Sequence, residues 1–179
     1  MKVRRVVTGH RGSKSVVISD GQTRKAREYV NVPGQASALI WSTQAKPSVP
    51  HDGTDPITEK SLYVPPVGET RLMLVDLAPD SVMMSSSFNP AAAGQEYMEH
   101  MPEFASKFEL DHPGMHTTDS VDYGIVLEGE VWLELDDGKQ VHLKRHDVVV
   151  QNGTRHAWRN KTDKPVRMAF VLIGAQRNG

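Results

Sequence analysis

The chain contains no cysteine among its 179 residues. Disulfide bonds, thiolate zinc sites and cysteine nucleophiles are therefore all excluded. It also lacks any run of about 18 apolar residues, so we expect no segment to cross a membrane. An excess of charge of one sign is missing too, since the formal net charge is −1. This balance argues against nucleic acid or an anionic membrane surface as a partner.

Several catalytic and nucleotide-binding motifs are also missing. The chain has no G-x-S-x-G, no Walker-type G-x4-G-K-[ST], no G-x-G-x-x-G and no HExxH pattern. The N-terminal stretch from Met1 to Val7 is basic and briefly apolar, but it ends at Gly9, too early for the core of a signal peptide. We therefore expect a cytoplasmic protein.

Short β-branched runs separated by turn residues dominate the chain and predict an all-β sandwich or barrel. With 38% apolar residues, a chain of 179 residues can bury one core, so one domain is expected. Residues 44–70 are rich in proline, glycine and aspartate and predict a long loop, which either packs over the barrel or stays mobile. The strands are expected at residues 3–8, 15–19, 27–30, 37–43, 71–77, 121–127, 130–135, 141–144, 147–151, 155–159 and 166–173.

One helical insertion interrupts the strands, at about residues 94–110. Its apolar side chains recur at helical spacing and are Tyr97, Met98, Met101, Phe104, Ala105 and Phe108. We interpret them as the buried face of an amphipathic helix that covers the barrel; a cofactor site of methionines and aromatic residues is the alternative. Pro102 lies inside the insertion and predicts a kink or two short helices.

Two strand-like segments each place a histidine near a hairpin turn. Side chains an even number of residues apart in a strand point to the same face, so His116, Thr118 and Asp122 share one face. Asp119 has odd spacing from His116 and is expected on the opposite face. In the second segment His156, Trp158 and Asn160 share a face for the same reason. If the two segments face one another across a small barrel, two imidazoles and a carboxylate converge on one pocket.

These segments resemble the two motifs of the cupin superfamily, G-x5-H-x-H-x(3,4)-E-x6-G and G-x5-P-x-G-x2-H-x3-N, and the resemblance covers roughly residues 67–175. The residues at the first motif's two histidines, glutamate and closing glycine are His116, Thr118, Asp122 and Gly129. The residues that match the second motif are Gly153, His156 and Asn160. His146 replaces its leading glycine, and Gln151-Asn152 replaces the proline step, with a connection one residue shorter.

The resemblance implies an all-β cupin-type double-stranded β-helix, or jelly-roll barrel, over residues 67–179. Residues 1–66 would then be an extension of strands and loop, packed on the barrel or at a dimer interface. Single-domain cupins commonly dimerise through their N-terminal strands, so the resemblance also implies a homodimer.

The resemblance further implies a divalent transition metal as cofactor, held by His116, Asp122 and His156. Two histidines and one carboxylate form the facial triad that suits non-haem iron, and manganese, nickel or zinc also accept such a site. The metal would leave coordination positions open for a substrate.

Two interpretations of the pocket remain open. In the first, the protein is a metal-dependent decarboxylase or dioxygenase that acts on a small hydrophobic or aromatic oxygenated substrate. Its catalytic residues are the metal ligands His116, Asp122 and His156. The residues expected to contact that substrate are Thr118, Trp158 and Asn160.

In the second interpretation the pocket is metal-free and binds a small molecule without catalysis, because Thr118 replaces a histidine and Asp122 is shorter than glutamate. A metal-free pocket could also be catalytic, with a carboxylate–imidazole pair formed by Asp122 with His116 or His156 as general acid and base; otherwise such a pair would only hold the strands together.

Overall fold

Strands make up most of the regular structure of residues 1–178, the part of the chain that the computed structural model describes. The strands are β1 (Arg4–Arg11), β2 (Lys14–Gln22), β3 (Lys25–Glu28), β4 (Ala36–Thr43), β5 (Thr70–Leu77), β6 (Ser120–Glu128), β7 (Glu130–Glu134), β8 (Gln140–Lys144), β9 (Val148–Asn152), β10 (Ala157–Arg159) and β11 (Val166–Gly174). The helices are α1 (Asp80–Met83), α2 (Pro90–His100) and α3 (Pro102–Ala105), and a short 3-10 turn spans Asp136–Gly138. Each predicted strand is present, and the predicted all-β fold class is confirmed.

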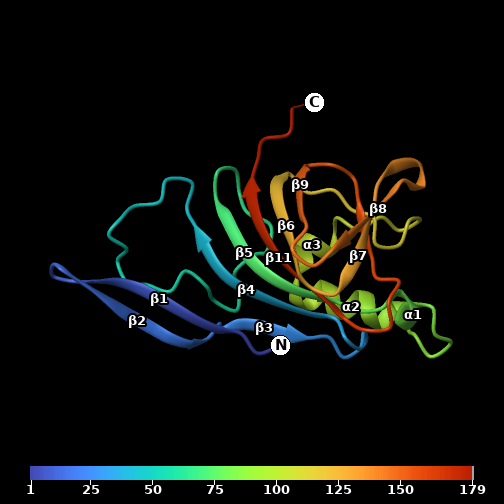
Figure 1. The fold of residues 1–179 in the computed structure, drawn as a ribbon, viewed down its shortest axis with the longest axis horizontal. Helices are drawn as coiled ribbons and strands as arrows, with labels where there is room; N and C mark the ends of the chain where they lie inside the picture. Colours follow the sequence, from blue (N-terminus) through green and yellow to red (C-terminus); the bar gives the residue numbers. More distant parts are fainter. Residues whose placement is uncertain (179) are drawn as a thin grey trace.

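The strands pair antiparallel in three sheets, of order β3-β4-β5-β11-β6-β9, β10-β7-β8 and β1-β2. Figure 1 shows the three-stranded sheet lying against one end of the strongly curved six-stranded sheet. A single cluster of buried side chains contains residues of both sheets, such as Met73 and Val126 from the larger and Val131 and Leu143 from the smaller. The core therefore lies between the two sheets.

The N-terminal strands have two different positions. β3 and β4 extend the six-stranded sheet beyond β5, with Leu39 paired with Met73. β1 and β2 instead form a separate hairpin that projects to one side of the molecule (Figure 1). Its exposed apolar side chains include Val6 and Val17, which are 48% and 55% exposed. A homodimer through this region stays a prediction.

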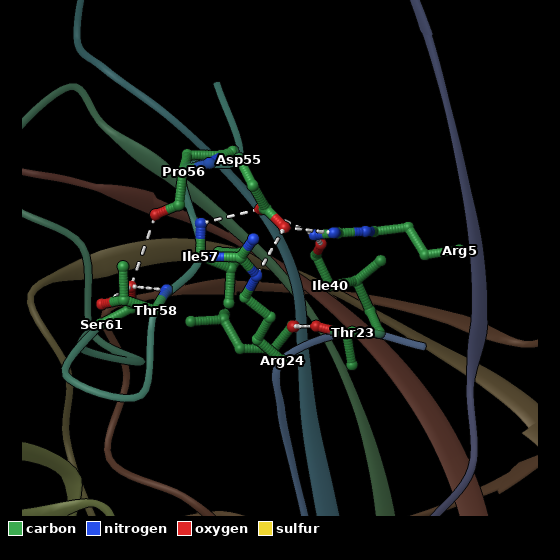
Figure 2. Close-up of polar contacts among 10 residues, drawn as sticks. Arg5, Thr23, Arg24, Ile40, Asp55, Pro56, Ile57, Thr58 and Ser61 are labelled. Carbon is green, nitrogen blue, oxygen red and sulfur yellow. Dashed lines mark hydrogen bonds and ion pairs between the residues drawn. The ribbon is translucent and has the colours of Figure 1, made fainter. Parts of the chain in front are cut away.

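The long loop between β4 and β5 packs against the strands. Its Ile57 is fully buried. Figure 2 shows the Asp55 carboxylate of this loop accepting hydrogen bonds from the guanidinium group of Arg5 and, at 3.0 Å, from the backbone N–H of Ile57. Arg5 also donates to the Ile40 carbonyl at 3.2 Å. One buried arginine thus links β1, β4 and the loop.

The helical insertion divides into two helices, as Pro102 predicts. α2 begins at Pro90, before the expected residue 94, because the Asn89 side chain accepts a hydrogen bond from Ala92 N–H at 3.1 Å and Pro90 occupies the first turn. The apolar spacing alone did not reveal this cap. α3 begins at Pro102 and ends at Ala105. Within residues 1–178, none of the helices combines the length and apolar character needed to span a bilayer.

His146 lies in the tight turn between β8 and β9 with a φ of 77°. This is the left-handed region, which disfavours residues with a Cβ by about 1 kcal/mol or more. We expect His146→Gly to raise the free energy of unfolding by about 0.5 kcal/mol, because relief of strain exceeds the added flexibility of the unfolded chain. Urea denaturation measures the change. His146→Ala keeps the Cβ and should give no gain; equal effects of the two variants would contradict the explanation.

Candidate metal and ligand site

His116 and His156 lie side by side inside the barrel. The backbone N–H of each donates to the carbonyl of the other, at 2.9 and 3.0 Å, in an isolated antiparallel bridge. Their ring centroids are 4.3 Å apart. The side chains are buried, with the two residues 5% and 3% exposed. The structure thus brings together the two histidines that the sequence places in separate segments.

Backbone carbonyls determine which nitrogen of each imidazole carries the proton. Nδ1 of His116 lies 3.0 Å from the Gly114 carbonyl, and Nδ1 of His156 lies 2.9 Å from the Thr154 carbonyl. A carbonyl oxygen only accepts hydrogen bonds, so we assign the proton to Nδ1 in both rings. Nε2 of each ring then keeps a free lone pair. Histidines that bind metals through Nε2 commonly have their other nitrogen fixed in this way.

Both histidines are held neutral by their surroundings. Burial and, to a smaller extent, the adjacent His156 together lower the pKa of His116 to about 3, against the opposing effect of the Gly114 carbonyl. Burial also lowers the pKa of His156, against the effect of the Thr154 carbonyl. At neutral pH the pair therefore offers two uncharged nitrogen ligands or hydrogen-bond acceptors.

Aromatic rings enclose the histidine pair. Phe104 of α3 and Phe108 lie 5.1 and 5.2 Å from the His116 ring, measured between centroids. Trp158 of β10 lies 5.6 Å from the His156 ring and packs on Phe170 at 5.5 Å. The helical insertion thus covers one side of the pair. Sequence analysis placed Phe104 and Phe108 on a covering helix but did not associate them with His116.

A row of polar side chains runs along the inner face of β6 and the segment before it. Thr118, Ser120 and Asp122 are all buried, at 2%, 1% and 6% exposed, so the predicted shared face is confirmed. Ser120 Oγ donates to Thr118 Oγ1 at 3.0 Å. Burial raises the pKa of Asp122, against the effect of both hydroxyls, and its Oδ1 has no hydrogen-bond partner among residues 1–178. Asp119 points outward and pairs with Arg177 at 2.5 Å, as its odd spacing predicts.

Gln151 on β9 is a buried polar residue that sequence analysis did not identify as part of the site. It pairs with Asp122 across the β6–β9 ladder and is 4% exposed. Its Oε1 accepts from Thr154 Oγ1 at 2.8 Å, while its Nε2 has no hydrogen-bond partner in the described part of the chain. The signal was present in the alternation of β9, where Val148 and Val150 are exposed. Motif comparison treated Gln151 only as part of a replaced proline step.

Asn160 has a different role from the predicted substrate contact. Its Nδ2 donates to the carbonyls of Leu77 and Lys164 at 2.9 and 2.8 Å. Its Oδ1 accepts from Thr162 N–H at 3.0 Å and from Thr162 Oγ1 at 2.7 Å. An amide has two donor hydrogens and two acceptor lone pairs, so these four bonds use its whole hydrogen-bonding capacity. The groups that surround the amide belong to a buried loop and not to the barrel interior. We therefore correct the expectation and assign Asn160 to the loop before β11.

The histidine pair fits a divalent metal, since both Nε2 atoms are free and both rings are neutral and buried. The carboxylate is less closely placed. Within residues 1–178, the only three side chains whose potential metal-ligand atoms all lie within 4.8 Å of one another are those of Glu109, Asp111 and His112. Asp122 and the two histidines therefore do not form a group of this size. That other group is exposed or half-buried, and Arg155 occupies its Glu109 carboxylate. Asp122 remains a predicted third ligand, with an unpaired oxygen.

Residues 107–173 match the family model of the cupin domain. Within these residues the chain is a cupin domain, as the resemblance of its motifs predicts. This range contains both histidines, Phe108, the polar row, Gln151, Trp158 and Phe170, and Phe104 lies just before it. The family assignment agrees with the all-β barrel and with the predicted resemblance.

The curated relatives match this chain over only part of its length. Phomopsin biosynthesis cluster protein C' of Diaporthe leptostromiformis is 52% identical over 63 residues, which cover 35% of this chain and 33% of the relative. The cupin-domain-containing oxidoreductase virC of Hypocrea virens is 45% identical over 62 residues, covering 33% and 32%. The oxidoreductase srdB of Neurospora crassa is 32% identical over 117 residues, covering 57% and 60%. The chain thus matches about a third of the length of the first two relatives.

Similarity to solved structures is lower. The cupin domain of an XRE family transcriptional regulator from Enterobacter cloacae is 13% identical, with a TM-score of 0.41 over 80% of this chain and 99% of that chain. A putative ethanolamine utilization protein Q from Salmonella typhimurium is 13% identical, with a TM-score of 0.40 over 98% and 99%.

Proposed function

We propose that this cupin is a metal-dependent enzyme of the oxidoreductase type that acts on a small, hydrophobic or aromatic, oxygenated molecule inside the barrel. The pair of buried, neutral histidines with free Nε2 atoms carries this proposal. His116 and His156 would hold the metal, with Asp122 as third ligand. The names of relatives such as virC, a cupin-domain-containing oxidoreductase, support the reaction class.

A bound iron, manganese, nickel or zinc ion would supply Lewis-acid polarisation or, with iron, oxygen chemistry, which fits decarboxylation or oxidative cleavage. The chain's own residues prepare the pocket. The carbonyls of Gly114 and Thr154 orient the imidazoles. The rings of Phe104, Phe108 and Trp158 exclude water and provide apolar walls for a planar substrate.

Metal content of the purified protein tests the proposal. We expect about one divalent ion per chain, a loss of about tenfold or more in occupancy in His116→Gln and His156→Gln, and no loss in His142→Gln. His142 is a suitable control because it is an exposed histidine, stacked on Trp132 and bonded to Glu130 at 2.9 Å. Glutamine keeps much of the imidazole volume, so the variants should fold. Metal binding should also raise the melting temperature of the wild type.

A metal-free, ligand-binding cupin is the second candidate. Two observations favour it. Thr118 replaces a histidine of the motif, and the ligand atoms of Asp122 and the two histidines do not all lie within 4.8 Å of one another. If the wild type takes up no iron, manganese, nickel or zinc after reconstitution, the metalloenzyme proposal is overturned. The neutral imidazoles and Asp122 would then act as hydrogen-bonding groups for the same class of small molecule.

A further inference from the structure

Gln151 and Asp122 face each other inside the barrel with unpaired polar atoms. They are direct partners in the β6–β9 ladder, and both are more than nine-tenths buried. Gln151 Nε2, a donor, and Asp122 Oδ1 each lack a hydrogen-bond partner within residues 1–178. A buried amide N–H without a partner is unfavourable, and most such groups in proteins are satisfied by a neighbour or a bound molecule.

The orientation of the Gln151 amide is fixed by a neighbour. Thr154 Oγ1 donates to Gln151 Oε1 at 2.8 Å, which directs the NH2 group away from Thr154. Thr154 also provides the carbonyl that accepts from Nδ1 of His156. One residue of the β9–β10 connection therefore positions both the glutamine donor and a histidine of the proposed metal site.

We propose that Gln151 is a substrate-binding residue that donates a hydrogen bond from Nε2 to a carbonyl or phenol oxygen of the molecule in the barrel. The location of that molecule next to His116 and His156 rests on the proposed function. The donor itself needs no metal. A planar oxygenated ring would contact Phe108 or Trp158 with its apolar faces and Gln151 with its oxygen, which makes this residue a determinant of specificity for oxygenated over purely apolar compounds.

Gln151→Met tests the proposal, because methionine has nearly the same shape but no donor. In the metal-free protein we expect its melting temperature to rise by about 2 °C or more, since an unpaired buried N–H is removed. In the metal-loaded protein, the dissociation constant of 4-nitrocatechol, measured by absorbance titration, should increase about tenfold or more. Gln140→Met is the matched control, an exposed glutamine bonded to Glu134 and Lys161, and should leave both values unchanged.

The two measurements separate this inference from the proposed function. A lower melting temperature with unchanged 4-nitrocatechol affinity in Gln151→Met would show that the amide has only a structural role. A wild type that takes up metal but does not bind 4-nitrocatechol would overturn the ligand class. A wild type that takes up no metal overturns the proposed function alone, because the rise in melting temperature is measured without metal and still decides whether the Gln151 donor is unpaired.

Discussion

Acidification of the metal-free protein from about pH 7 to about pH 4 is expected to lower the free energy of unfolding by about 3 kcal/mol through His116 alone. Burial lowers the pKa of His116 to about 3 in the folded protein, whereas an unfolded chain keeps it near its ordinary value of 6.5. Between these values the unfolded state binds a proton that the folded state does not. His116 therefore does not lower the free energy of unfolding above about pH 6.5, and the free energy of unfolding decreases as the pH falls towards 3.

The neighbouring groups act in known directions. The pKa of His156 is also lowered by burial, so this residue adds to the loss in acid. Burial raises the pKa of Asp122, so the folded state binds a proton at higher pH than the unfolded state, and this residue partly offsets the loss. The histidines share one pocket at a centroid distance of 4.3 Å, so protonation of one opposes protonation of the other.

Urea denaturation between pH 4 and 7 measures this dependence. The slope of the free energy of unfolding against pH should become clearly flatter in His116→Gln, because the titrating group is gone. Carboxylates whose pKa is lowered by arginine partners, such as Glu134 beside Arg159, contribute equally to both proteins and cancel in the comparison. Parallel curves for wild type and His116→Gln would mean that folding does not lower the pKa of His116.

The sequence predicted the strands well because local patterns determine them. β-branched runs and turn residues located every strand of the barrel, and the period of two placed His116, Thr118 and Asp122 on one buried face while sending Asp119 outward. The same rule applied to β9 would have identified Gln151. The family motif does not identify it, because the motif marks histidines and the proline step, whereas Gln151 is the inward residue between the exposed Val150 and Asn152.

Other features of the site depend on contacts between distant segments. The approach of Phe104 and Phe108 to His116 requires the helical insertion to fold back over the barrel, and helical spacing alone does not say which residue a buried face meets. The tautomers of the histidines depend on the carbonyls of Gly114 and Thr154, whose directions follow from turn geometry. Asn160 shows the opposite error: strand alternation was extended one residue past the end of β10, where the chain leaves the sheet.

Asn160→Ala is expected to lower the free energy of unfolding by about 3 kcal/mol, because it leaves buried groups without hydrogen-bond partners. Asn160 is 1% exposed, and its amide joins the Leu77 carbonyl at the end of β5 to the Lys164 carbonyl before β11. Alanine supplies neither donor nor acceptor, and the carbonyls and the Thr162 N–H lose their partners together. Chemical denaturation at neutral pH measures the loss.

Thr162→Val is the matched comparison, since it leaves the Asn160 amide in place. It removes the hydroxyl that donates to Asn160 Oδ1 at 2.7 Å and to the Lys164 carbonyl at 3.0 Å and accepts from Lys164 N–H at 3.4 Å, and it should cost about 1 kcal/mol. Because the Asn160 amide faces the loop, metal content and 4-nitrocatechol affinity of folded Asn160→Ala should equal those of the wild type. An Asn160→Ala protein of normal stability but weakened 4-nitrocatechol binding would instead restore the role in substrate binding that strand alternation first suggested. The two residues that alternation grouped on one face, His156 and Asn160, are thus separable by experiment: one should control metal binding and the other only folding stability.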